Sequence, residues 1–266
     1  MQISHPDAYW NGHSPENVFL VTDDMGASAG TGFVVYQHLP HLYPDRPVNI
    51  YFQSEGTQDA LYMLYGALVA RARQLRDISP GEPARIYTCL DPSDQRAIDF
   101  YQHGGMNCED REVRVRLAIP GGEVRVPMGC AMEPTPMHTP EQQIGFLDRL
   151  NQNDVTHIDP TFLTQLMQTR HFHATGLFSA GQLAGEALVA GNGSYAELMA
   201  FYITPAFRRK GLGTALCRWT LWALSCAGVQ NVGARFVTRS LPQKAISRDL
   251  AAREIETTAV FPQLFM

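Results

Sequence analysis

Apolar and polar residues follow two patterns along the chain, one typical of helices and one typical of strands. Between Thr57 and Asp77, apolar residues recur every three or four positions, as they do on the buried face of an amphipathic helix. The same spacing predicts further helices at 95–103, 140–150, 160–169, 212–227 and 242–252. Runs rich in β-branched and aromatic residues predict strands at 17–22, 32–36, 48–52, 85–90, 112–119, 123–126, 174–178, 183–189, 195–203, 232–237 and 257–264.

These predicted elements occur twice in the same order: hairpin, strand, long helix, strand, short helix, strand. A repeated order indicates an internal duplication, and we therefore expect two domains, 1–125 and 126–266. Pro120-Gly121-Gly122 is expected to turn the strand 112–119 into the strand 123–126 at the end of the first domain. The second domain carries two additional helices ahead of its hairpin.

The passage from Tyr195 to Leu216 carries the strongest chemical signal: an apolar strand, the loop Arg208-x-x-Gly211-x-Gly213, and then a helix. Glycines let the backbone approach a ligand closely, and the helix N-terminus offers unpaired N–H groups and a positive dipole, which together favour phosphate. The consecutive cations Arg208, Arg209 and Lys210 add donors for phosphate oxygens. The alternative is a solvated basic turn, which is less favoured because the strand and helix are in register with the loop.

The spacing of this loop narrows the class of phosphate ligand. A nucleoside-triphosphate loop has its lysine after the glycines, whereas Lys210 precedes them. A dinucleotide loop has a third glycine where this chain has Leu216. The strand and loop instead resemble the acetyl-CoA loop of the GNAT family of N-acetyltransferases, and the repeated order resembles tandem GNAT proteins.

This resemblance implies a mixed α/β fold class: two tandem GNAT acyl-CoA N-acyltransferase folds, each a mostly antiparallel mixed sheet flanked by helices. In the family, loop amides hold the pyrophosphate, and the preceding strand splays from its neighbour so that its backbone holds the pantetheine arm and polarises the thioester carbonyl. The implied co-substrate is acetyl-CoA, with no metal. The implied cofactor-binding residues are Phe201, Tyr202, Ile203, Arg208, Arg209, Lys210, Gly211, Leu212, Gly213 and Thr214.

The first half matches a different part of the family pattern. The segment from Asp94 to Met106 resembles the late GNAT motif, with Tyr101 at the position whose tyrosine commonly protonates the departing CoA thiolate. The segment corresponding to the loop, 53–58, contains no Arg or Lys, and Glu55 would lie beside the pyrophosphate. We therefore expect 1–125 to be a degenerate GNAT-like domain that lacks the CoA loop.

The second half keeps the loop but loses the tyrosine, because Asp249 aligns with Tyr101. An aspartate ionised at neutral pH is a poor proton donor, so the general acid is left between Tyr202, Tyr195 and solvent. Glu197 is the candidate general base, because a catalytic glutamate of GNAT histone acetyltransferases occupies this strand. We expect Glu197 to share one strand face with Met199, Phe201 and Ile203, whose apolar side chains would desolvate it.

Glu186 on the neighbouring strand is a weaker candidate for the base or for a substrate anchor. His171 and His173 lack a third ligand nearby in the sequence, so no metal site is expected.

The apolar and charged fractions of the chain are those of a soluble globular protein. The five cysteines show no Cys-x-x-Cys spacing, which favours reduced thiols. The chain also has no long apolar run and no signal-like start. Together these features predict a cytoplasmic protein without a membrane partner. Residues 1–125 hold 10 Arg, no Lys and 16 acidic residues, a net of −6. Residues 126–266 hold 11 basic and 10 acidic residues, a net of +1, so no broad basic face for nucleic acid is expected. The acidic excess of the first half favours either a cationic substrate or only solubility.

The predicted function is transfer of an acetyl group from acetyl-CoA to an amine of a small molecule or peptide, by direct attack in a ternary complex. The alternatives are a non-catalytic acyl-CoA-binding or regulatory protein, and an acyltransferase that uses a longer acyl-CoA. We expect a monomer or a homodimer.

Overall fold

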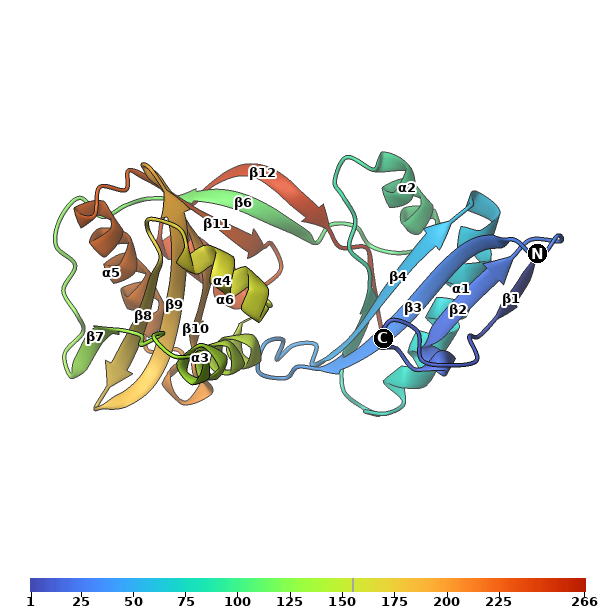
Figure 1. The fold of residues 1–266 in the computed structure, drawn as a ribbon, viewed down its shortest axis with the longest axis horizontal. Coiled ribbons are helices and arrows are strands. Elements are labelled where there is room, and N and C mark those ends of the chain that lie inside the picture. The colour runs from blue at the N-terminus through green and yellow to red at the C-terminus, as the bar shows by residue number, and fades with distance from the viewer. Residues whose placement is uncertain (155) are drawn as a thin grey trace. The chain divides into compact units, whose positions relative to one another are not determined.

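The computed structural model describes residues 1–154 and 156–266, which form two compact units (Figure 1). Unit 1 consists of Met1–Arg111 and Ala259–Met266, and unit 2 consists of Glu112–Thr258. The chain therefore passes from one unit to the other after Arg111 rather than at the expected boundary between residues 125 and 126, and it returns at its C-terminal end. Each unit has its own mixed sheet, and the predicted mixed α/β fold class with two sheets flanked by helices is confirmed.

The sheet of unit 1 has the strand order β1-β2-β3-β4-β5-β13. Its strands are β1 (Gln2–Ser4), β2 (Val18–Thr22), β3 (Ser28–His38), β4 (Val48–Gly56), β5 (Ala84–Tyr87) and β13 (Gln263–Phe265). Only β4 and β5 are parallel, because the helix α1 (Gln58–Arg76) connects them. The apolar face of α1 packs on the sheet through residues such as Leu64 and Leu68, both fully buried.

Local sequence signals explain where the helices of unit 1 begin. The Thr57 hydroxyl accepts a hydrogen bond from the Ala60 N–H at the start of α1, and the Asp94 carboxylate accepts one from Ala97 at the start of α2 (Gln95–His103). Because β4 continues to Gly56, only Thr57 separates it from α1. Unit 1 thus has no loop in this position.

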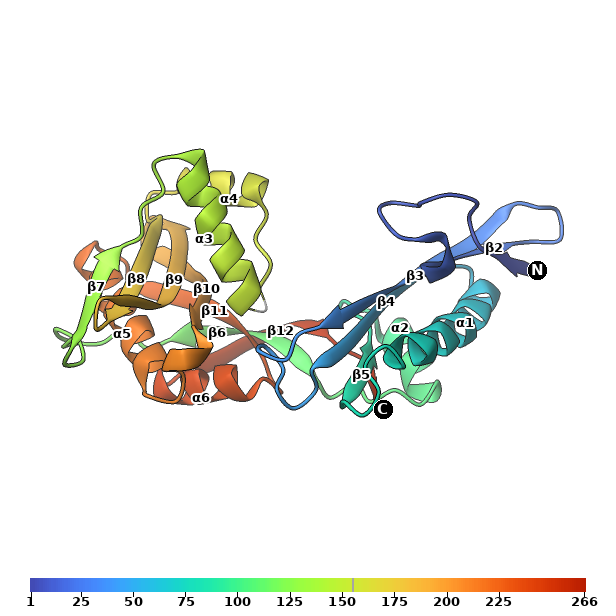
Figure 2. The ribbon, with the colours of Figure 1, turned by 90° about the horizontal axis from the view of Figure 1, so that it is seen from below.

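The sheet of unit 2 has the order β12-β6-β11-β10-β9-β8-β7, in which β10 and β11 are parallel. Its strands are β6 (Arg111–Leu117), β7 (Cys130–Pro134), β8 (His173–Ser179), β9 (Gln182–Asn192), β10 (Tyr195–Ile203), β11 (Asn231–Val237) and β12 (Arg253–Val260). Figure 2 shows α3 (Pro140–Asn153) and α4 (Pro160–Met167) on one face of this sheet and α5 (Leu212–Cys226) and α6 (Leu241–Asp249) on the other.

Two predictions for the strands are wrong. Residues 123–126 form no strand, and the whole segment between β6 and β7 is irregular, so Pro120-Gly121-Gly122 closes no hairpin. The expected closing strand 257–264 is divided into β12 and β13, which belong to different sheets. Pro262 lies between them, and proline cannot donate to a strand ladder.

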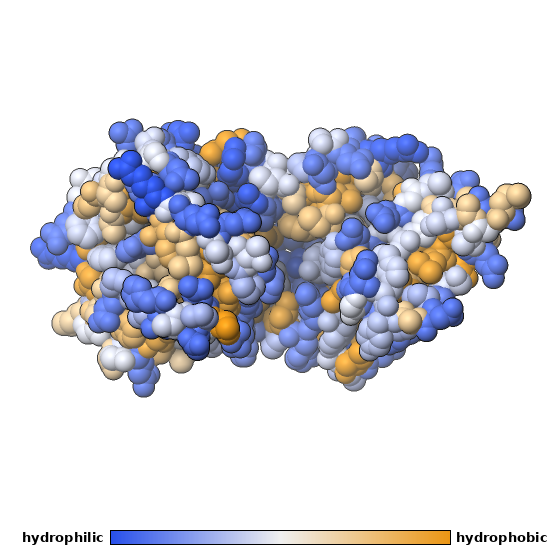
Figure 3. Space-filling model, viewed as in Figure 1, coloured by the Kyte–Doolittle hydropathy of each residue, from blue (hydrophilic) through white to orange (hydrophobic). Residues whose placement is uncertain are grey.

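Each face of the unit 2 sheet is covered by its own apolar core. One core joins α5 to the sheet through residues such as Leu216 and Leu198, and the other joins α3 and α4 through residues such as Phe146 and Leu188. On the outside of unit 2, polar and apolar residues are interspersed over the face seen in Figure 3. Among the described residues, no helix is both long and apolar enough to cross a membrane.

Candidate functional site

The two parallel strands at the centre of unit 2 separate part-way along their length. β10 pairs with β11 from Tyr195 to Leu198 and beyond that point pairs only with β9. The Thr204 N–H donates to Ala184 O of β9. By the alternation of strand N–H groups, the Phe201 N–H therefore points the opposite way, toward the gap left by β11. The gap thus exposes strand backbone that has no strand partner.

A β-bulge at Met199 accompanies this separation, and it changes which side chains share a face. Met199 packs against the core under α3 and α4, whereas Phe201 and Ile203 pack with Leu198 against the core under α5. The prediction that Glu197, Met199, Phe201 and Ile203 share one face is therefore wrong, because the bulge shifts the alternation by one residue.

The loop between β10 and α5 runs from Thr204 to Gly211 and contains the short 3-10 turn Pro205–Phe207. Arg209 (φ 61°) and Gly211 (φ 74°) both adopt left-handed backbone conformations, and Gly211 is the N-cap of α5. An αL conformation there is favourable for glycine because it lacks Cβ. The N-terminal N–H groups of α5 therefore face a loop whose shape depends on the predicted glycine.

Two of the loop cations are held by backbone oxygens. The Arg208 Nε donates to Ile203 O at 2.8 Å, and partial burial lowers the pKa of its guanidinium. The Lys210 Nζ donates to Ala206 O at 3.3 Å and lies 5.3 Å from the centre of the Phe207 ring. These contacts fix the start and the tip of the loop.

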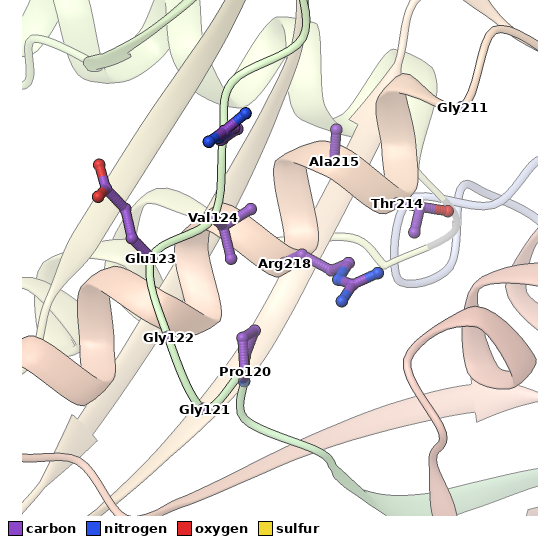
Figure 4. Close-up of a pocket in the computed structure, with 10 residues that line it drawn as sticks. Pro120, Gly121, Gly122, Glu123, Val124, Gly211, Thr214, Ala215 and Arg218 are labelled. Atoms are coloured by element: carbon purple, nitrogen blue, oxygen red, sulfur yellow. The ribbon is translucent and has the colours of Figure 1, made fainter.

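A cavity of about 560 Å³ lies beside the loop and the first turns of α5. One wall is the irregular segment 120–125, and the other is Gly211, Thr214, Ala215 and Arg218. In Figure 4, the Arg218 side chain extends from α5 toward Thr214, whereas Glu123 points away from them. The cavity therefore combines a helix N-terminus with the guanidinium of Arg218, and Arg125 also lines it.

Asp249, which aligns with the family tyrosine, lies next to this loop. It is the last residue of α6, and its Oδ2 accepts a hydrogen bond from the Thr214 hydroxyl at 2.9 Å. The Arg248 guanidinium is 3.3 Å from its other carboxylate oxygen. Asp249 thus accepts a hydrogen bond from Thr214, a residue of the predicted cofactor-binding set.

A buried polar network lies on the opposite face of β9 and β10. Glu186 is 1% exposed and accepts hydrogen bonds from four donors: Arg149 Nε and Nη2, both at 2.9 Å, Thr135 Oγ1 at 3.2 Å, and the Tyr202 hydroxyl. Both oxygens of the carboxylate are fully used, and the fork of Arg149 supplies the compensating charge. Glu186 is therefore part of the structure of the site and is not placed to take a proton from a substrate.

Tyr202 is the partner of Glu186 across the strand pair and is 2% exposed. Burial, followed by the adjacent Glu186 carboxylate, strongly raises the pKa of the Tyr202 phenol. Such a phenol keeps its proton and is a weak acid. Arg149, whose side chain is 42% exposed, connects this network to the surface of α3.

Glu197 lies two residues before the bulge, on the paired part of β10. Its Oε1 is 3.3 Å from Arg235 Nε on β11, and its side chain is 18% exposed. An arginine therefore contacts a carboxylate that we expected to have only apolar neighbours. Tyr195, the other phenol considered, is 41% exposed at the start of the same strand.

Several residues of this site were missed by the sequence analysis. Arg149 and Thr135 complete the Glu186 network, Asp154 binds the Phe201 N–H, and Arg218 lines the cavity. Only Arg218 carries a local signal, since it is one turn beyond Thr214 on the predicted helix. Among the described residues, no group of three or more His, Cys, Asp or Glu is placed to hold a metal ion.

Comparisons with known proteins agree with this geometry. Residues 141–242, from α3 into α6, match the model of the Acetyltransferase (GNAT) family. The chain carries a GNAT domain. The match includes the strand separation, the loop and α5, and the GNAT domain supports acyl-CoA N-acyltransferase activity in general terms. A search of curated proteins found no match.

Solved structures resemble the GNAT domain together with unit 1. A GCN5-related N-acetyltransferase from Sphaerobacter thermophilus is 14% identical with a TM-score of 0.50, over 96% of this chain and 83% of that one. A probable N-acyltransferase from Enterococcus faecalis V583 is 9% identical with a TM-score of 0.56, over 92% and 61%. A tandem GNAT protein from the clavulanic acid biosynthesis pathway is 16% identical with a TM-score of 0.44, over 93% and 82%. At these identities, the first two likenesses show the fold.

Proposed function

We propose that this protein transfers an acetyl group from acetyl-CoA to an amine of a small molecule or peptide, using unit 2. The observation that carries the proposal is the separation of β10 from β11 immediately before the loop and α5. Strand N–H groups without strand partners suit the amides and carbonyl of an acylated pantetheine arm. The helix N-terminus with its glycine loop suits a pyrophosphate. Unit 1, in which β4 runs almost directly into α1, is proposed to be degenerate and to bind no CoA.

The proposed reaction is direct attack by the amine. The acceptor ammonium loses one proton to Glu197, directly or through water, and its nitrogen forms a bond to the thioester carbon. The C–S bond then breaks, and the second proton lost from nitrogen goes to the sulfur of CoA. Glu197 is proposed as the base because it is a carboxylate on the strand that holds the acyl group, next to the point of separation.

We propose that Tyr202 orients the site rather than donating the second proton. Its phenol already donates to Glu186, and ionisation beside that carboxylate is unfavourable. Water therefore delivers the proton to the thiolate in this proposal. The Tyr202–Glu186–Arg149 network would instead hold β9, β10 and α3 together on the side from which the amine approaches.

Two measurements test the function. Titration calorimetry should detect acetyl-CoA binding, and release of free CoA should be measured over a library of amines. Glu197→Gln should lower kcat by about 100-fold or more without changing the affinity for acetyl-CoA. Glu256→Gln is the matched control, because Glu256 also pairs with an arginine, at 2.9 Å, but on β12; it should leave kcat unchanged.

The rival function is a non-catalytic acyl-CoA-binding protein, and it is favoured by Asp249 at the tyrosine position. Binding of acetyl-CoA with no acetylation of any amine would decide for this rival. Ranking acetyl-, succinyl- and long-chain CoA by thermal shift separates acetyl transfer from transfer of a longer acyl group.

A further inference from the structure

Asp154 makes an unusual contact with the strand that borders the gap. Asp154 is the C-cap of α3, and the residue is only 8% exposed. Its Oδ2 accepts a hydrogen bond from the Phe201 N–H at 2.8 Å, and its Oδ1 accepts one from the Thr156 N–H at 2.9 Å. A side chain from a helix end therefore takes the place that a neighbouring strand would have on this N–H.

Asp154 lies close to three elements of unit 2: α3, β10 and α5. Phe201 belongs to β10, Asp154 ends α3, and Cys217 of α5 is close enough for the Asp154 charge to add to the effect of burial in raising the pKa of the thiol. β11 no longer pairs with β10 at this level. The carboxylate thus enters the same gap that the proposed function assigns to the acyl end of the cofactor.

One N–H cannot make a full hydrogen bond to two acceptors at once. In the proposed function, the oxygen of the thioester carbonyl is the group that accepts from this part of β10, so it competes with Asp154 for the Phe201 N–H. Free CoA has no such carbonyl and does not compete. The contact therefore distinguishes an acylated cofactor from the product CoA.

We propose that Asp154 is a specificity-determining residue that occupies the acyl-carbonyl position in the cofactor-free protein, is displaced by acyl-CoA, and stays in place when CoA is bound. The inference rests on the proposed function. It implies that acyl-CoA binding costs one charge-assisted hydrogen bond, which CoA binding does not. It also implies that the end of α3 responds to the acyl group, and α3 is the helix that carries Arg149.

The test compares the affinities for acetyl-CoA and CoA in matched variants. Asp154→Ala removes the competitor, so the Kd for acetyl-CoA should fall about tenfold or more, while the Kd for CoA should change by less than about twofold. Asp154→Asn keeps an accepting oxygen but not the charge, and its effect should be smaller. Asp159→Ala is the control, because Asp159 also accepts from a backbone N–H, that of Phe162 at 2.9 Å, at the start of α4; both affinities should stay the same.

A second measurement covers the case in which Asp154→Ala folds poorly. In the unmodified protein labelled with ¹⁵N, the Phe201 amide resonance should shift on addition of acetyl-CoA and stay in place on addition of CoA. Equal changes for both ligands, in either experiment, would overturn the role of Asp154 while leaving the proposed function intact. Failure of the unmodified protein to bind acetyl-CoA at all would overturn both.

Discussion

A glutamate or glutamine at position 211 tests whether the loop binds phosphate. Gly211 has φ 74°, and a Cβ added there would meet nothing within 4 Å. The first side-chain atom therefore meets no neighbour in either variant, and both have the same backbone cost of about 1–2 kcal/mol for a left-handed residue. Because Gln and Glu have nearly the same shape, comparing Gly211→Glu with Gly211→Gln isolates the effect of one negative charge.

The size of that effect follows from Coulomb's law. A carboxylate about 5 Å from a pyrophosphate, in a solvent-exposed site with an effective dielectric constant of about 40–80, would weaken binding by about 1–3 kcal/mol, or roughly 5- to 150-fold in Kd. The same carboxylate at the N-terminus of α5 is favourable for the helix dipole. A lower affinity of the Glu variant than of the Gln variant therefore does not come from poorer folding.

The assay is titration calorimetry of acetyl-CoA, with S-acetyl-pantetheine as the comparison ligand because it lacks the pyrophosphate. The Glu variant should bind acetyl-CoA more weakly than the Gln variant, and the difference should shrink as salt is added. Both variants should bind S-acetyl-pantetheine equally. Equal affinities of the two variants for acetyl-CoA at low salt would refute the placement of phosphate in this loop.

Three further predictions concern stability. Gly56→Ala should lower the free energy of unfolding by more than about 3 kcal/mol, because the new Cβ would lie 2.5 Å from Ala29 O. In the control Gly12→Ala the new Cβ meets no neighbour, and the loss should be about 1 kcal/mol. Equal losses for the two variants in urea denaturation would contradict this prediction. Thr220→Val should stabilise the protein by about 1 kcal/mol, because the fully buried Thr220 hydroxyl has no hydrogen-bond partner; destabilisation would mean that the hydroxyl has a partner such as water. Burial raises the pKa of Tyr87 from 10.0 to about 12. The folded state therefore holds the phenol proton more strongly than the unfolded state does. The free energy of unfolding should be unaffected by this group below pH 10 and should fall by roughly 2–3 kcal/mol as the pH rises to 12. Tyr87→Phe should remove that part of the decline, and an unchanged alkaline unfolding curve would count against it.

The helices and their first residues could be predicted from the sequence because the signals are local. Thr139 and Gln142 form a capping box three residues apart at the start of α3, and the Asp159 carboxylate accepts a hydrogen bond from the Phe162 N–H at the start of α4. The loop before α5 could also be predicted, since a glycine next to a helix start reports a backbone conformation that other residues disfavour.

Strand partners could not be predicted in the same way. Residues 111–117 alternate like any half-exposed strand, yet β6 pairs with β11, more than a hundred residues later in the chain. Residues 263–265 pair with β5 instead of continuing β12. A strand's own pattern specifies which face is buried, but its partner depends on packing between segments far apart in the chain.

The candidate site likewise has one part that local sequence predicts and another part that depends on packing between distant segments. The glycine loop before α5 could be predicted from the sequence alone, because the residues that shape it are consecutive. The surroundings of the strand separation required the tertiary structure: a bulge at Met199 changes the strand faces, and folding brings Arg149 to Glu186. Asp154 reaches the Phe201 N–H across 47 positions. Such contacts depend on how α3 packs against β10, and no local pattern of residues records that packing.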